Sequence, residues 1–294
     1  MTNKFSSILV TGIIKNVERR INKEVRRIES KLQKYFELVS FELIESDSDD
    51  KTLINLDGLK SKKSNFDYQT FGKLSQIIPS RIDRLRYCRN KYVEQIRKIP
   101  SSTKPNFVLV VDFDIKNNSL NFEKLFHFVA VTNQNWDAIF CNQSGRYFDV
   151  YALRSEGWCD QDCFLEAKKL AISIGWEKAR DVAIWTKMKK INQNSHQLIK
   201  VTSAFGGMAL YKTEVFQRFN YELCDGVHPS ESEHISLHKK IADIGGQMFI
   251  HPGFTNFSWN PHNLASFKVF RRLDTLTKRA HIDFGRKLAR KLFA

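Results

Sequence analysis

The stretch FVLVVDFD at residues 107–114 decides the fold. Five apolar, mostly β-branched residues in a row are typical of a strand buried in the middle of a parallel sheet. Asp112 and Asp114 follow where that strand ends, and the chain can turn there and aim both carboxylates at one point. Carboxylate oxygens held in this way bind hard divalent cations, which in turn neutralise substrate phosphates. A solvated acidic turn after a core strand is the other interpretation.

The first hundred residues predict an α/β fold. Residues 8–14 form an apolar run, residues 16–36 have apolar side chains at helical spacing, and residues 38–44 form a second apolar run. Strand, helix and strand in this order predict a right-handed crossover and a mainly parallel sheet flanked by helices. A further helix is expected over residues 78–96, before Pro100. Such doubly wound sheets bind ligands at the carboxyl ends of their strands. The polar loop 45–52 and the Asp112/Asp114 pair share that edge.

The second half has a mixed pattern. We expect strands at 136–140 and 148–153, a helix over 166–178, and a strand entered through Gly206-Gly207. A helix over 235–244, closed by two glycines, and a strand at 247–251 complete the predicted elements.

Composition limits the partners and the location of the protein. The chain has 294 residues, 42% hydrophobic content and a net charge of +15, so the partner is expected to be acidic. Nucleic acid, anionic lipid and phosphorylated substrate all fit that charge. The five cysteines have no zinc-finger spacing, and no apolar run reaches the roughly 18–20 residues of a membrane span. With no signal peptide at the N-terminus, these features predict a cytoplasmic protein, with the inner face of the cell membrane as a second location.

The last 32 residues differ from the rest. Apolar and basic residues alternate there, and Phe284, Leu288 and Leu292 fall on one helical face. A basic amphipathic helix of this kind suits an anionic membrane surface, although a docked helix with a solvated charged face fits equally well. We therefore divide the chain into a domain at 1–262 and a basic amphipathic extension at 263–294.

Five motifs, in order along the chain, resemble those of a GT-A glycosyltransferase. The Asp-Phe-Asp segment is preceded by RLRYCRN at 84–90 and by ESDSD at 45–49, and it is followed by AFGGMALY at 204–211 and SEHISLH at 232–238. The resemblance runs from about Ile8 to about Pro252, and it is closest to bacterial and viral enzymes that build surface polysaccharide.

The resemblance implies a divalent metal, Mn²⁺ or Mg²⁺. Asp114 would bind it directly, and Asp112 would bind the ribose or reach the metal through water. A late histidine, His251 or His262, would be the third ligand.

It also implies the nucleotide contacts. Asp112 and Phe113 are two of the candidates. The others are Thr11 and Ser46, which are at strand exits, and Arg84, Arg89 and Asn90, which are on the helix before the Asp-Phe-Asp strand. A guanidinium suits phosphate. An exposed basic helix face and ordinary loop capping are the alternatives.

Glu233 is the candidate general base, because transfer to a sugar hydroxyl needs a carboxylate that can accept its proton. Glu231 is a competitor, and Glu233 could also be a plain carboxylate at a helix N-terminus. The remaining sugar-site candidates, on the donor or the acceptor side, are Asp149, Arg154, Gly206, Gly207 and His234. A buried ion pair is an equal alternative for Asp149 and Arg154.

The sequence therefore favours a metal-dependent glycosyltransferase. A UDP-sugar is the first expectation for the donor and a GDP-sugar the second. The acceptor would be a hydroxyl of a glycan or lipid-linked glycan, of lipopolysaccharide or capsule type, and the transfer would be inverting.

A basic nucleic-acid-binding protein is the alternative from another class, but no helix-turn-helix, zinc finger or RNP-like strand is present, so we expect no nucleic-acid partner. A nucleotidyltransferase would need a glycine- and lysine-rich loop after the first strand, which residues 11–15 lack. A membrane-associated scaffold would explain the C-terminus but not the ordered polar motifs.

Overall fold

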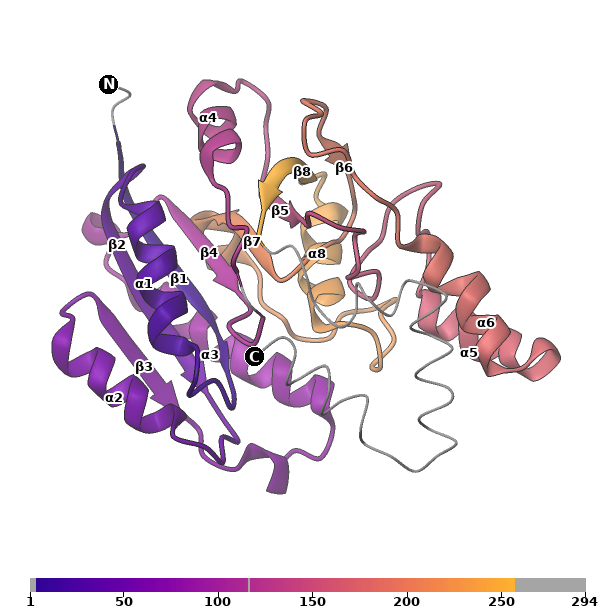
Figure 1. Ribbon diagram of the computed structural model, residues 1–294, viewed down its shortest axis with the longest axis horizontal. Helices are drawn as coiled ribbons and strands as arrows, with labels where there is room; N and C mark the ends of the chain where they lie inside the picture. The colour runs from indigo at the N-terminus through magenta and orange to yellow at the C-terminus, as the bar shows by residue number, and fades with distance from the viewer. Residues whose placement is uncertain (1–3, 116, 257–294) are drawn as a thin grey trace.

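The computed structural model describes residues 4–115 and 117–256 of the chain. Within these residues one eight-stranded sheet forms the centre of the molecule (Figure 1). In spatial order its strands are β3 (Phe66–Thr70), β2 (Phe36–Glu45), β1 (Phe5–Ile14), β4 (Phe107–Val111), β7 (Met208–Lys212), β5 (Ala138–Asn142), β8 (Met248–Thr255) and β6 (Ile199–Lys200). Only β7 and β6 run against the other described strands, so the predicted mainly parallel α/β sheet is confirmed.

Helices cover both faces of the sheet. One face packs against α1 (Ile21–Leu32), α2 (Thr52–Lys62) and α4 (Glu123–Val131). The other packs against α3 (Arg81–Lys98), α7 (Thr213–Arg218), α8 (Glu233–Asp243) and the helix pair α5 (Cys163–Ile174) and α6 (Trp176–Ala183). Side-chain alternation along β4 explains the two layers, because Val108 and Val110 join one core while Leu109 and Val111 join the other.

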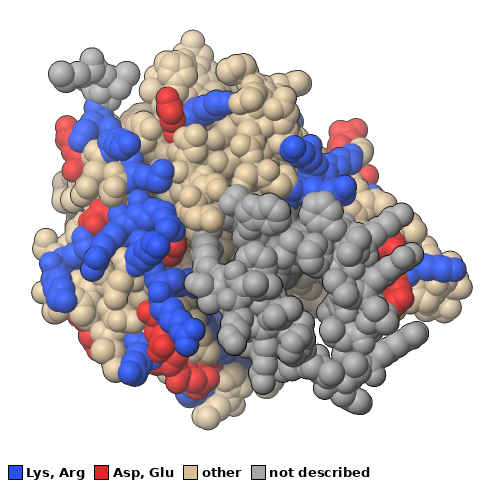
Figure 2. Space-filling view, in the orientation of Figure 1, with Lys and Arg blue, Asp and Glu red and all other residues tan. Residues whose placement is uncertain are grey.

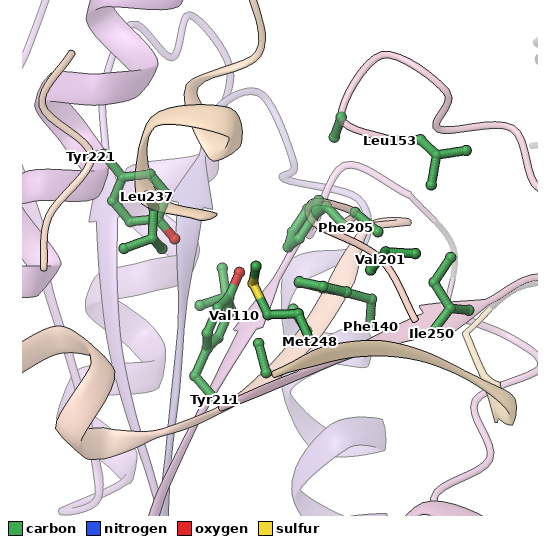
Figure 3. Close-up of a cluster of buried hydrophobic side chains, with 14 of the residues drawn as sticks. Val110, Phe140, Leu153, Val201, Phe205, Tyr211, Tyr221, Leu237, Met248 and Ile250 are labelled. Atoms are coloured by element: carbon green, nitrogen blue, oxygen red, sulfur yellow. The ribbon is translucent and has the colours of Figure 1, made fainter. Parts of the chain in front are cut away.

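The core on the α3 and α8 side takes side chains from several strands of the sheet. Figure 3 shows Val110, Phe140, Tyr211 and Leu237 converging from three strands and one helix. Each of these side chains is fully buried. Removing a buried aromatic or leucine side chain from such a core typically costs about 3–5 kcal/mol, so this packing fixes where the neighbouring polar side chains lie.

Several predicted boundaries are corrected. The helix predicted over 16–36 is limited to α1, since Phe36 instead opens β2. The segment predicted as a strand at 148–153 is irregular instead, and the Val150 N–H donates to the Phe148 carbonyl within it. The helix predicted over 166–178 is interrupted at Gly175, whose φ of +78° separates α5 from α6. The elements α2, β3 and α4 have no counterpart in the sequence prediction.

The predicted boundary at residue 262, the basic helix at 263–294 and His262 lie outside the described residues. Across 4–115 and 117–256, no helix is both long enough and apolar enough to cross a bilayer.

One carboxyl on the sheet makes stability depend on pH. Burial and the neighbouring Asp67 carboxylate raise the pKa of Glu42 to about 7. Glu42 and Asp67 line a cavity of about 440 Å³ that includes none of the residues with a predicted site role.

Glu42→Gln should therefore stabilise the protein above pH 7. The folded state binds the Glu42 proton more tightly than the unfolded chain, whose glutamates titrate near pH 4.3, so stability falls as pH rises from about 4.3 to about 7. We expect the variant to gain about 1–3 kcal/mol at pH 8 and nothing at pH 4. Urea unfolding at both pH values measures the difference, and equal gains at both would refute this origin.

Candidate functional site

The two aspartates after β4 point out of the sheet edge, while the residue between them points inward. Asp114 is exposed, and the Asp112 side chain is 38% exposed. Phe113 is fully buried, where its ring would lie 3.1 Å from any Cβ added at Gly12. The ring therefore anchors the loop from below, and only the Phe113 backbone is left for the predicted nucleotide contact.

Gly206 and Gly207 connect this loop to its neighbours. Their φ angles of +71° and +84° are in the region that favours glycine. The Gly207 carbonyl accepts the Asp112 N–H at 2.9 Å, and the Asp149 carboxylate accepts the Gly206 N–H at 2.9 Å. A Cβ on Gly207 would lie 2.5 Å from Ile115 Cδ1. The two glycines thus bring Asp112 and Asp149 to one place.

Arg89 on α3 joins the donor-side aspartate to the candidate base. Its Nε donates to Glu233 Oε1 at 2.7 Å, and its Nη2 lies 3.9 Å from Asp112 Oδ1. The guanidinium stacks over the rings of Phe205 and Tyr221, at 5.2 Å and 5.5 Å from their centroids. The Arg89 and Glu233 side chains are each only 5% exposed. Glu233 is the first residue of α8, so the helix N-terminus also favours its carboxylate.

Carboxylates outnumber cations in this cluster. Asp112 lies close enough to Asp114, Asp149 and Glu233 to be influenced by their charges. The cations in contact with these residues are Arg89 and Arg20, and Arg20 contacts the backbone carbonyl of Asp114. Desolvation, followed by repulsion from Asp114, raises the pKa of Asp112 well above its usual range. Desolvation is also the main reason that the pKa of Asp149 is raised. The cluster would therefore gain from one more cation.

His234 packs inside the cluster. Its ring stacks on Phe205 with centroids 4.0 Å apart, and its Nε2 lies 3.7 Å from Glu233 Oε1. Burial and the nearby Arg89 charge lower its pKa well below the usual range, so the ring is neutral. Neither ring nitrogen has a hydrogen-bond partner within the described part of the chain.

Two of the predicted nucleotide residues have other partners. Thr11 lies inside β1, not at its exit, and its hydroxyl donates to the Glu42 carbonyl at 2.6 Å. Asn90 accepts the Tyr221 N–H at 2.8 Å. The structure therefore places both side chains on the protein's own backbone.

Ser46 and Arg84 lie at the exit of β2. Ser46 follows that strand directly, with its hydroxyl 3.6 Å from the Cys88 sulfur. Arg84 donates to the carbonyls of Ile78 and Pro79, and its Nε lies 3.6 Å from Asp47 Oδ2. Asp47 has a φ of +64°, so these contacts fix an unusual turn beside the functional edge.

Arg154 forms a buried ion pair, which is the alternative to a sugar contact that the sequence leaves open for it. It contacts Glu231, and its Nη2 lies 3.7 Å from Asp162 Oδ2. Glu231 is thus occupied by a structural partner, whereas Glu233 belongs to the cluster with Asp112.

His251 lies on β8 against the α4 side of the sheet. Its Nδ1 accepts the Gly253 N–H, its ring contacts Phe128, and burial lowers its pKa to about 4. Across the described ranges, no three His, Cys, Asp or Glu side chains are arranged to hold a metal ion. The structure therefore does not bring His251 into a three-residue site with Asp112 and Asp114. Two carboxylates still suit a Mg²⁺ or Mn²⁺ ion whose other ligands are waters and phosphate oxygens.

The sequence does not reveal three amide side chains that support the glycine turn. Gln143 and Asn256 donate to the Gly206 carbonyl at 3.0 Å and 2.9 Å, and Asn117 donates to the Asp112 carbonyl. All three are fully buried. Nothing in their local sequence marks them, because their role depends on contacts between distant segments.

Arg89→Met should cost about 3–5 kcal/mol of folding free energy, because it leaves the Glu233 carboxylate buried without its partner. The double variant Arg89→Met/Glu233→Met should lose at least about 2 kcal/mol less folding free energy than the sum of the losses in the two single variants. Urea unfolding of the wild type, the two single variants and the double variant gives the four free energies that this comparison needs. Additive losses would mean that the two side chains are not coupled.

Comparison with known proteins gives likenesses in structure only. No family model and no curated protein matches the chain. One similar solved structure is a mannosyltransferase from Pyrobaculum calidifontis in complex with GDP-mannose and Mn²⁺, with 13% identity and a TM-score of 0.46 over 87% of this chain. This chain spans only 57% of that protein's length.

Two other similar structures have comparable values. TarS from S. aureus has 9% identity and a TM-score of 0.45 over 88% of this chain and 62% of its own. Glucosyl-3-phosphoglycerate synthase from Mycobacterium tuberculosis, in complex with Mn²⁺, UDP and phosphoglyceric acid, has 11% identity and a TM-score of 0.42 over 94% of this chain and 79% of its own.

Proposed function

We propose that this chain is a metal-dependent glycosyltransferase of the GT-A type. It would transfer a sugar from a nucleotide-sugar donor to a hydroxyl of a surface glycan. The observation that supports this best is the Arg89 bridge, which holds Asp112 and Glu233 on one guanidinium at the carboxyl edge of the sheet. A donor-phosphate anchor and a proton acceptor would then lie side by side, as transfer between two substrates needs.

Asp114 and Asp112 would hold the divalent cation, Mn²⁺ or Mg²⁺. Bound there, the cation would neutralise charge on the departing diphosphate. The excess of carboxylates around Arg89 supports such a site, since an added cation would relieve their repulsion. Ser46 and Arg84, at the neighbouring strand exit, are the proposed nucleotide contacts, with a UDP-sugar favoured over a GDP-sugar.

Glu233 would accept the proton of the acceptor hydroxyl in a single inverting displacement. Asp149 and the glycine turn would line the sugar site, with His234 beside the base. We propose a glycan or lipid-linked glycan of lipopolysaccharide or capsule type as the acceptor. The enzyme would work in the cytoplasm, at the inner face of the membrane, with residues 263–294 as a basic surface anchor.

A thermal-shift panel of UDP-, GDP-, CMP- and dTDP-sugars, each with and without Mn²⁺, tests the proposal. At about 100 times its Kd, a ligand adds about 2.7 kcal/mol to the stability of the native state. One donor should therefore raise the Tm by about 5 °C, and only with Mn²⁺ present. Stabilisation by nucleic acid and by no donor would favour the nucleic-acid-binding alternative instead.

A further inference from the structure

The α5–α6 hairpin concentrates exposed apolar side chains. Ile172, Ile174, Trp176 and Val182 are 89%, 41%, 46% and 53% exposed. Four of the ten exposed large apolar residues of the described chain thus fall within eleven positions. Such clustering marks a contact surface, whereas scattered exposed apolar residues need no explanation.

The hairpin turns its small residues inward and its large ones outward. Ala167, Ala179 and Ala183 are fully buried where the two helices pack. Gly175, between the helices, has a φ of +78° and open space where a Cβ would be. Figure 1 shows the pair at the edge of the molecule, beyond β6 and away from α1 and α2. The pair therefore projects from the described part of the molecule.

Basic residues outnumber acidic ones by four to three on the two helices of the apolar tip, with Lys168, Lys169, Lys178 and Arg180 against Glu166, Glu177 and Asp181. Lys168, Lys169 and Lys178 are exposed, and none of them forms an ion pair with a residue that the structure describes. Arg180 lies over the Trp176 ring, with its guanidinium carbon 6.0 Å from the centroid. In Figure 2 the surface at this edge is largely uncharged, with both basic and acidic side chains beside it. Isoleucine and tryptophan bordered by lysine and arginine are typical of elements that lie in the membrane interface.

We propose that the α5–α6 tip inserts into the interfacial layer of an anionic lipid bilayer. Ile172, Ile174 and Trp176 would enter the headgroup boundary, and the three lysines would contact anionic headgroups. Four exposed apolar side chains are far fewer than the roughly 20–30 residues that each partner contributes to a stable protein interface. A bilayer has no such requirement, because each buried apolar group contributes independently.

The base of the hairpin is attached to the acceptor side of the candidate site. Asp162 caps α5 by accepting the Phe164 and Leu165 N–H groups, and it lies 3.7 Å from Arg154. Arg154 in turn contacts Glu231, two residues before Glu233. Docking at the tip would therefore present the Glu233 side of the cluster to a lipid-linked acceptor. This last step rests on the proposed function, whereas the membrane contact does not.

Vesicle binding by the full chain tests the membrane contact. The variant Ile172→Gln/Ile174→Gln/Trp176→Gln should bind vesicles of 30% phosphatidylglycerol in phosphatidylcholine at least tenfold more weakly than the wild type, in a sedimentation assay at 0.1 M salt. The matched control is Ile54→Gln/Ile77→Gln/Val131→Gln, which removes three side chains that are 67%, 76% and 64% exposed elsewhere. It should bind within twofold of the wild type.

Unchanged vesicle binding by the hairpin variant would overturn the proposal. Two further measurements on the same variant would then show what covers the tip instead of a membrane. A lowered Tm with unchanged binding would place another part of this chain on the tip, and a loss of self-association would place a second copy there. Hairpin-dependent vesicle binding without any donor-induced Tm shift would retain this inference while removing the glycosyltransferase proposal.

Discussion

Asp114→Asn should abolish metal-dependent sugar transfer, lowering kcat/KM by about 10²–10³-fold or more. Asp114 is exposed, and its backbone carbonyl, not its carboxylate, accepts the Arg20 hydrogen bond. The substitution removes one anionic oxygen donor without disturbing packing. Initial rates measured across an Mn²⁺ titration, with the donor found in the thermal-shift panel, give the effect.

Glu37→Gln is the matched control for Asp114→Asn. Glu37 is also exposed, but it lies at the amino end of β2, at the opposite edge of the sheet. It should leave the Mn²⁺ dependence unchanged. Wild-type activity in the Asp114 variant would remove that residue from the metal site.

Glu233→Gln should lower kcat by about 10²–10⁴-fold while donor binding is retained. The amide oxygen of glutamine can still accept the Arg89 Nε–H bond, so the variant keeps the local geometry but loses the proton acceptor. Steady-state kinetics give kcat, and the donor-induced Tm shift shows whether the nucleotide site is intact.

Glu231→Gln separates a base from a structural carboxylate. Glu231 is paired with Arg154 in a network that also includes Asp162, so this variant should lose stability while keeping kcat within tenfold of the wild type. A larger kcat loss at Glu231 than at Glu233 would reverse the two roles.

Elements with a strong local signal could be predicted from the sequence. The continuous apolar run predicts β4, and the helical spacing of apolar residues before Pro100 predicts α3, because burial of one or both faces produces these patterns. α2 was missed because only Thr52, Leu56 and Leu59 on it are buried, too few to mark a clear stripe. The pattern at 148–153 resembled a strand, yet Asp149 bonds to the Gly206 backbone, so tertiary contacts overrode the local preference.

The candidate site could be predicted in its parts but not in its connections. Asp112, Gly206-Gly207 and Glu233 were each singled out, and the structure gathers them at one edge. Arg89 was assigned to phosphate alone, because its pairing with Glu233 spans 144 positions and leaves no local trace. Long-range pairs of this kind follow from the topology, in which α3 and α8 pack on the same face of the sheet.

Electron paramagnetic resonance of Mn²⁺ tests the central claim most directly. The signal of free Mn²⁺ should fall when wild-type protein and the stabilising nucleotide sugar are both present, because the cation would be held between Asp112, Asp114 and the diphosphate. The account predicts that Asp114→Asn restores the free signal and that Glu233→Gln does not. Equal Mn²⁺ binding by wild type and Asp114→Asn, with donor present, would contradict it.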